Sequence, residues 1–489
     1  MEDLKNGLKG KAIRGGLAKI CAQGANFLFR IGTLMIFARL LAPEDFGIVG
    51  MVTVVTGVLS LFKDFGLSTA TIQRVTISDE QTSTLFWLNL LVGGILWLLS
   101  SAIAPILVAF YHEPRLLWVT VALAAGFLFN AAGVQHSALL QRQMRFTALS
   151  LIEIISLLAS SVVGIYMAVA GLGYWALVGW SVILPAANSV GVWLITAWVP
   201  GRPRREVEIR SMVRFGGTIT LNSLVVYVAY NLDKALIGRF CGADALGIYG
   251  RAYQLISMPT EYINGAFSSV AFSTLSRLQD DQMLLKRYFL KGYTMVLTVT
   301  LPITIACALF AEDIILIFLG PKWKDAVVTF RLLVPTVLVF ALINPTGWLL
   351  FSIGRVGRSL KIALVIAPLV ISGYVIGLPY GPNGVAFGFS AMMILWVVPH
   401  IAWCINGTMI SGRDVLEAVS RPFLSGILAA AFVFGLQLVS GQLMSPLMRL
   451  FLGGGVLLCS YLWILLYVMN QKTFYLNLFR ELRRRTSVG

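Results

Sequence analysis

The chain has 489 residues, of which 58% are hydrophobic and only 12% are charged. Its mean hydropathy of +0.83 excludes an ordinary soluble protein, in which charged residues make up about 25% of the sequence. The formal net charge of +16 does not indicate nucleic-acid binding, because excess Lys and Arg in a polytopic membrane protein mark its cytoplasmic loops. Since the cysteines form no Cys-x-x-Cys pair and no Cys/His cluster, we predict no metal site, no cofactor and no disulfide framework.

Apolar residues gather in runs of about 20, the length at which a helix crosses a bilayer. Because backbone groups cannot stay unpaired in lipid, these runs must be helices, and the short alternating segments of barrel strands are missing. We therefore predict an all-α polytopic membrane protein with about 14 transmembrane helices. In chain order the predicted spans are 17–38, 46–62, 85–110, 117–137, 147–170, 174–198, 212–238, 247–272, 290–318, 329–351, 361–378, 384–405, 423–439 and 448–468.

A short motif occurs twice, over residues 38–50 and again over residues 238–250. The matched residues are Arg39 and Arg239, Gly47 and Gly247, Ile48 and Ile248, and Gly50 and Gly250. Each copy ends one apolar run and opens the next, which indicates an internally duplicated protein. Internal repeats are common in secondary transporters, with the substrate site between the two halves.

Loop charge predicts the orientation of the spans. With the N-terminus in the cytoplasm, the inside segments hold most of the basic residues, among them Arg202, Arg204, Arg205, Arg210, Arg214, Arg277, Lys286, Arg287, Lys291, Arg355, Arg358, Lys361, Arg480, Arg483, Arg484 and Arg485. Both termini are then cytoplasmic, and both motif copies lie in outside loops.

Halves of the same orientation form a parallel internal repeat, with two lobes of about six helices each. We expect an N-lobe at residues 1–200, a cytoplasmic linker at 201–216 and a C-lobe at 217–405. Residues 406–489 then hold two peripheral helices and a basic cytoplasmic tail.

Ionisable residues inside a span are site candidates, because they are costly in lipid. Arg30 lies near the middle of the first span. It is either a cation in a central cavity, where guanidinium donors bind a phosphate bidentately, or half of an internal ion pair. Glu153, in the span 147–170, either balances Arg30 or couples transport to H+ or Na+.

The span 247–272 is unusually polar, with Arg251, Glu261 and Asn264, and Pro259 predicts a kink. A helix of this kind cannot face lipid, so we predict that it lines an aqueous cavity. Arg251 and Glu261 are too far apart along one helix to pair, so each needs another partner.

Four further polar positions are weaker cavity candidates. Asp233 and Lys234 end the span 212–238, and an interfacial ion pair is the alternative interpretation. Asn26 and Asn89 lie within spans, where amides also form helix-packing hydrogen bonds.

A possible inner gate follows the second span. Gln73 and Arg74 lie there on the inside, and the competing interpretation is anchoring to lipid phosphates.

Several short motifs resemble the polysaccharide transporter family, the Wzx-type flippases of the multidrug/oligosaccharidyl-lipid/polysaccharide (MOP) superfamily. In the first half they are Leu41-Ala42-Pro43-Glu44-Asp45-Phe46-Gly47, Asp64-Phe65-Gly66-Leu67 and Gln73-Arg74. In the second half they are Asp233-Lys234, Ile237-Gly238-Arg239, Leu246-Gly247-Ile248-Tyr249, Ala252-Tyr253, Phe318-Leu319-Gly320-Pro321-Lys322-Trp323, Gly354-Arg355 and Leu360-Lys361. The resemblance covers nearly the whole chain, and the branch that exports colanic acid and related exopolysaccharides is the most similar.

The resemblance implies a function. Two lobes around a central cavity would carry an undecaprenyl-diphosphate-linked oligosaccharide across the bacterial inner membrane by alternating access, with the lipid tail left in the bilayer. The family places cationic residues in that cavity, which fits Arg30 and Arg251. The expected partners are the lipid-linked oligosaccharide, membrane lipids, H+ or Na+ as a coupling ion, and the polysaccharide polymerase machinery.

Two other classes compete with this interpretation. A multidrug/cation antiporter of the same superfamily usually keeps an acidic residue in its first lobe, whereas the first span has Arg30 and no carboxylate, and a cationic cavity repels cationic drugs. A polysaccharide polymerase or glycosyltransferase would be expected to carry a sizeable outer loop or an acidic cluster, and we find neither. We therefore expect a transporter that is not an enzyme.

Overall fold

The computed structural model describes residues 23–63, 68, 71–72, 77–203, 223–440 and 444–476. The chain divides into two compact units, Met1–Gly250 (unit 1) and Arg251–Gly489 (unit 2). Within the described ranges, ten stretches are long and apolar enough to cross a membrane, and one of them, Gly357–Ile405, joins two helices. The predicted all-α, multi-pass membrane fold is therefore confirmed, while the predicted lobe boundaries stay a prediction.

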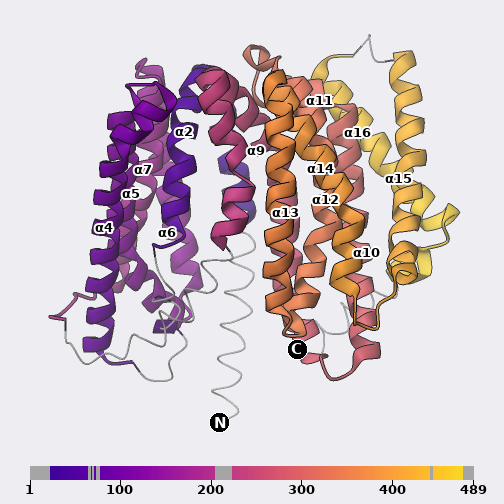
Figure 1. Cartoon of the computed structure of the whole chain (residues 1–489), viewed down its shortest axis with the longest axis horizontal. Helices are drawn as coiled ribbons and strands as arrows, with labels where there is room; N and C mark the ends of the chain where they lie inside the picture. The colour runs from indigo at the N-terminus through magenta and orange to yellow at the C-terminus, as the bar shows by residue number, and fades with distance from the viewer. Residues whose placement is uncertain are drawn as a thin grey trace. The chain divides into compact units, whose positions relative to one another are not determined.

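Unit 1 is a bundle of long helices (Figure 1). Residues 23–40 are helical and are followed by α2 (Pro43–Ser60), α4 (Asp79–Tyr111), α5 (Leu116–Arg142), α6 (Phe146–Val169) and α7 (Tyr174–Thr196). Helix α5 is central, since it packs against α2, α4, α6 and α7, and α6 also packs along α7. These bounds lie within a few residues of the predicted spans, except that α4 begins six residues earlier than the predicted start at 85.

The early start of α4 has a local cause. Ser78 and Gln81 form a capping box, in which each side chain bonds the backbone N–H of the other residue at 3.2 Å. Asp79 and Glu80 add negative charge to the first turn, where it interacts favourably with the helix dipole. Hydropathy alone misses this polar turn because it extends the helix beyond the apolar run.

The chain that leaves α7 is attached to unit 1 by aromatic side chains. Trp198 lies 5.1 Å from the His136 ring, which stacks on Trp193 at 4.3 Å between centroids. Trp87 donates a hydrogen bond to the Gly201 carbonyl at 2.8 Å. The segment 198–201, where the predicted linker begins, therefore packs onto α4, α5 and α7.

Helix α9 (Leu232–Arg277) is two helices that meet at Gly242, inside the loop that we expected between the spans 212–238 and 247–272. Its only residue with non-helical angles is Gly242, at φ 89° and ψ 179°. Pro259 lies inside the second of these helices and keeps helical angles, and the kink predicted there stays a prediction. Gly242 suits the junction because Gly occupies positive φ at little steric cost.

Unit 2 contains the remaining helices. They are α10 (Gln282–Leu309), α11 (Ala311–Phe318), α12 (Ala326–Ser352), α13 (Val356–Gly377), α14 (Gly381–Ile405), α15 (Gly412–Ser440) and α16 (Pro446–Trp463), followed by a π-helical turn at Ile464–Val468. The predicted span 290–318 is two helices that meet at Phe310, which has φ −108° and ψ 24°. Helix α12 packs against α10 and α14, and α13 packs against α14.

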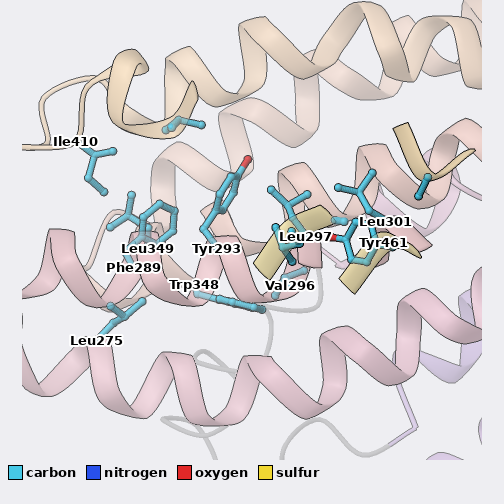
Figure 2. Packing of buried hydrophobic residues seen from close by; sticks show 14 of the residues in the cluster. Leu275, Phe289, Tyr293, Val296, Leu297, Leu301, Trp348, Leu349, Ile410 and Tyr461 are labelled. Carbon is cyan, nitrogen blue, oxygen red and sulfur yellow. The ribbon is translucent and has the colours of Figure 1, made fainter. Parts of the chain in front are cut away.

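The core of unit 2 lies where α10, α12, α15 and α16 meet. Figure 2 shows Tyr293 and Leu297 of α10 among Trp348, Leu349 and Tyr461, all of them buried. The Tyr293 hydroxyl donates to the Leu342 carbonyl at 2.9 Å, which satisfies its polar end inside an apolar cluster. One face of α15 and of α16 thus joins this core, while their outer faces carry exposed apolar side chains, including Phe432, Val439, Phe451 and Trp463.

Candidate functional site

Arg30 lies on the helical residues 23–40 of unit 1, between two buried polar residues on the same face. Asn26 is 7% exposed and Thr33 is 6% exposed, and the Thr33 and Ser161 hydroxyls form a hydrogen bond of 3.0 Å. The spacing of four and then three residues puts all three side chains on one helix face. Arg30 is exposed, and it makes no ion pair or hydrogen bond with any residue that the structure describes.

Glu153 does not lie against Arg30. It is exposed on α6, and within the described ranges it makes no ion pair or hydrogen bond. The structure therefore does not bring together the two charges that could have balanced each other in unit 1. A role in coupling stays open for Glu153 as a prediction.

Asn89 lies inside the bundle. It is fully buried on α4, and neither of its side-chain amide atoms has a hydrogen-bond partner among the described residues. Buried amides are normally bonded, so its predicted helix-packing bond is not seen there. The predicted inner-gate residues Gln73 and Arg74 lie outside the described residues.

Asp233 forms a small buried polar network at the start of α9. Its carboxylate is 0% exposed, accepts a hydrogen bond of 2.6 Å from the Tyr249 hydroxyl and accepts another of 2.7 Å from the Lys234 backbone N–H. The Lys234 ammonium donates to the Asn231 side chain at 2.7 Å. Asp233 is thus buried within unit 1, and the interfacial pair with Lys234 stays a prediction. Our reasoning from sequence missed Tyr249 because its pairing with Asp233 joins two sides of the break at Gly242.

The polar positions of the second half of α9 belong to unit 2. Arg251 is half-buried and donates a hydrogen bond to Gln254, one turn further along the helix. Glu261 is exposed, and the Asn264 side-chain oxygen is buried with no partner among the described residues. One partner of Arg251 is therefore a neighbour on its own helix at i+3.

Arg115 connects the first motif copy to the loop between α4 and α5. Its guanidinium lies 2.5 Å from the Glu44 carboxylate and 2.7 Å from that of Glu113. The hydrogen bond from Arg115 lowers the pKa of Glu113 below its ordinary value, because it stabilises the ionised carboxylate. These ion pairs lie at the loop between α4 and α5 and at the start of α2. Arg30 and Arg251, by contrast, lie within helices.

Two hollows lie in the part of unit 2 that the structure describes. A groove of about 640 Å³ between α15 and α16 is lined almost entirely by apolar side chains, among them Phe432, Phe451 and Trp463. A second hollow of about 340 Å³ lies at the turn between α9 and α10 and includes Ser273, Thr274 and Arg277. The first suits a hydrocarbon chain, and the second presents hydrogen-bond donors.

The fold defines the class of the protein. A solved structure of the lipid II flippase MurJ in an inward closed conformation aligns with a TM-score of 0.74 over 96% of this chain and 100% of that one. The sequences are only 13% identical, so this likeness concerns the fold. The chain is a multi-pass membrane protein with this fold, and a solved multidrug resistance MATE family transporter of the MOP superfamily also aligns, with a TM-score of 0.61 over 81% of this chain at 14% identity.

The sequence then identifies the family. The family described as polysaccharide biosynthesis protein matches residues 36–328, and the chain belongs to it. The chain is 26% identical to the lipopolysaccharide biosynthesis protein WzxC of Escherichia coli (strain K12) over 89% of this chain and 90% of that protein. It is 32% identical to the teichuronic acid biosynthesis protein TuaB of Bacillus subtilis (strain 168), but over only 60% of this chain and 61% of TuaB. The predicted membership among the Wzx-type transporters is confirmed.

Proposed function

We propose that this protein is a flippase that moves polyprenyl-diphosphate-linked oligosaccharide repeat units across the bacterial inner membrane for lipopolysaccharide or exopolysaccharide biosynthesis. The observation that carries the proposal is Arg30, an exposed guanidinium on the helical residues 23–40, within the predicted span 17–38, with no ion pair or hydrogen bond to any described residue. An ionisable group inside a membrane marks a substrate or ion path. A diphosphate is the ligand that best satisfies its planar donors.

The comparisons support a lipid-linked cargo. MurJ is named as a lipid II flippase, and WzxC and TuaB are named for the biosynthesis of cell-surface polymers. In the proposed cycle, the lobes alternate between cytoplasmic and outer openings while Arg30 and Arg251 hold the head group. The apolar groove between α15 and α16 suits the polyprenyl tail, whose CH2 groups gain about 0.8 kcal/mol each on burial.

Asp233 is the group in unit 1 that we assign to the coupling ion. A buried carboxylate that accepts a hydrogen bond of 2.6 Å from a hydroxyl belongs to the groups that take part in ion paths and proton relays. In the orientation that loop charge predicts, both termini are cytoplasmic. We infer that the polymerase machinery receives the cargo on the outer face.

The chemistry at Arg30 disfavours a multidrug/cation antiporter. A cationic drug would meet a guanidinium with no partner among the described residues, and like charges repel most strongly where the dielectric constant is low. The relatives are biosynthesis and transport proteins, which supports a role in transport rather than in catalysis.

The test is the sidedness of polyprenyl-diphosphate-linked oligosaccharide in membranes with and without this protein. Sealed right-side-out and inverted vesicles are probed with a membrane-impermeant lectin. We expect intact repeat units to accumulate on the cytoplasmic face when the protein is missing. Repeat units that reach the outer face without it, and stay unpolymerised there, would reject translocation and favour a polymerase.

A further inference from the structure

The two copies of the repeated motif touch each other through their backbones, entirely within unit 1. A methyl group built on Gly47 would lie 1.7 Å from the carbonyl oxygen of Ala243, and one built on Gly247 would lie 1.8 Å from that of Pro43. Neither neighbour is a flexible side chain that can turn aside. The two glycines are therefore required by a close backbone approach, which only a residue without Cβ permits.

The two contacts are the same contact made twice. Pro43 and Ala243 are matched positions of the repeat, as are Gly47 and Gly247, so the 47–243 pair becomes the 247–43 pair when the copies are exchanged. This is the reciprocity of an isologous interface about a two-fold axis. We call these four residues the glycine seam.

The other two matched glycines of the motif are not constrained in this way. A methyl group on Gly50 would meet only the Leu246 side chain, at 3.4 Å, which is an ordinary van der Waals distance. One on Gly250 would meet nothing within 4 Å. Gly50 and Gly250 are thus matched internal controls in the same motif.

The surroundings of the glycine seam are closed and apolar. Phe46 is 3% exposed, Ile48 is 0% exposed and Leu246 is 2% exposed. The seam itself consists of backbone CH groups facing carbonyl oxygens, which are weak interactions. Such a contact excludes water when it is closed.

We propose that the glycine seam is the outer gate of the transporter, closed in this structure and parted at each release of cargo. The proposal rests on the proposed function for its cargo and on the predicted orientation for its side of the membrane. A reciprocal seam opens by moving one copy of the motif away from the other, so both contacts are lost together.

Cys241 provides a reporter beside the glycine seam. It is a half-buried free thiol two residues before Ala243. A background in which Cys21, Cys307, Cys404 and Cys459 are replaced by alanine leaves Cys241 as the only target for a membrane-impermeant maleimide added to intact cells. The rate of its labelling measures how often the seam is open.

We expect Gly47→Ala and Gly247→Ala each to raise the labelling rate of Cys241 by about 5- to 30-fold, the change that a lost contact of ordinary size makes in an equilibrium. The two effects should be equal, because either methyl group breaks a reciprocal contact. Gly50→Ala and Gly250→Ala should label at the parent rate. Export of polysaccharide should fall only in the first pair.

A second measurement avoids variants that fail to fold. In the parent background, Cys241 should label faster in cells that make the lipid-linked oligosaccharide than in cells that do not. Three outcomes would overturn the gate. The four variants could label equally in well-folded protein, Cys241 could label only after the membrane is permeabilised, or folded protein could be lost without faster labelling. Faster labelling of the seam variants, in a protein that moves no oligosaccharide in the vesicle assay, would keep the gate and reject the cargo.

Discussion

The two copies of the repeat share a glycine at a close backbone contact, but they differ in the polar side chains near it. Both keep the glycine that allows a backbone to approach, at Gly47 and Gly247. At the matched positions 33 and 233, however, one copy has Thr33, bonded to Ser161, and the other has Asp233, bonded to Tyr249. The difference teaches that the duplication supplies a symmetric frame, while the charged groups on that frame are specific to each copy.

The backbones of the two copies also differ at one matched position. Ala42 caps the N-terminus of α2 in an extended conformation, φ −86° and ψ 157°, whereas Gly242 interrupts α9 at φ 89° and ψ 179°. The first copy therefore ends one helix and begins another, with Pro43 at its first turn. The second copy also ends one helix and begins another, but its junction lies at a Gly with positive φ.

The largest effect should come from the charge that only the first copy has. Arg30 stands where the second copy has Tyr230. Arg30→Ala should lower the translocation rate by about 100-fold or more, since removing a charged partner from a desolvated pair costs about 2–5 kcal/mol. The vesicle sidedness assay measures it, with membrane abundance as a check on folding. Arg413→Ala is the matched control, because the Arg413 side chain is 87% exposed and pairs only with Glu417. Normal translocation by Arg30→Ala would remove Arg30 from the site.

The next effect should come from the buried network of the second copy. Tyr249→Phe removes the hydroxyl that donates to Asp233, and a buried acceptor left short of a donor costs about 1–3 kcal/mol, or more when it is charged. The counterpart in the first copy, Thr33→Val, removes a neutral hydrogen bond and should cost about 0.5–1.5 kcal/mol. Thermal unfolding of the two purified variants in one detergent decides the order, and a larger loss for Thr33→Val would contradict the comparison.

The backbone difference between the two copies predicts unequal effects on stability for a third pair of matched substitutions. Gly242→Ala forces a Cβ into a conformation that is essentially restricted to Gly, at a cost of about 1–3 kcal/mol. Ala42→Gly, at the matched position, should change stability by less than about 1 kcal/mol, because extended angles suit both residues. The shift in unfolding temperature of each variant is the measurement. Equal shifts would show that Gly242 does not need its positive φ.

The smallest effect should come from the exposed ion pairs beside the first copy. Arg115→Ala should cost no more than about 1 kcal/mol, because the Arg115 and Glu44 side chains are 40% and 49% exposed and solvent screens the pair. Since the pKa of Glu113 is lowered in the folded protein, its contribution is complete above the ordinary carboxyl pKa and is lost as the pH falls through the lowered value. Unfolding temperatures at pH 7 and in this acidic range should therefore differ less in Arg115→Ala than in the parent.

Much of the fold follows from local sequence. Most predicted spans lie within a few residues of the observed helices, because the length and hydropathy of a transmembrane helix are imposed by the bilayer. One error falls at a particular residue. Phe310 divides one predicted span, because backbone angles at a single position depend on what packs around it.

The candidate site is less predictable than the spans. Intramembrane charge was enough to single out Arg30, Asp233 and Arg251, but not to say what each one contacts. Glu153 does not meet Arg30, and Asp233 meets Tyr249. Partner choice depends on the rotation of each helix about its axis, which tertiary packing sets and hydropathy does not record.

The sequence by itself determined that this is an all-α membrane protein with a duplicated motif, since composition, run length and repeat spacing are properties of the chain alone. Only the tertiary structure decided that Gly47 and Gly247 each face the backbone of the other copy. The physical reason is that a glycine in the sequence looks the same whether it lies in a turn, on an open helix face or in a close contact. Which of these it occupies is decided by the element that packs against it, here one that lies 200 residues away in the sequence.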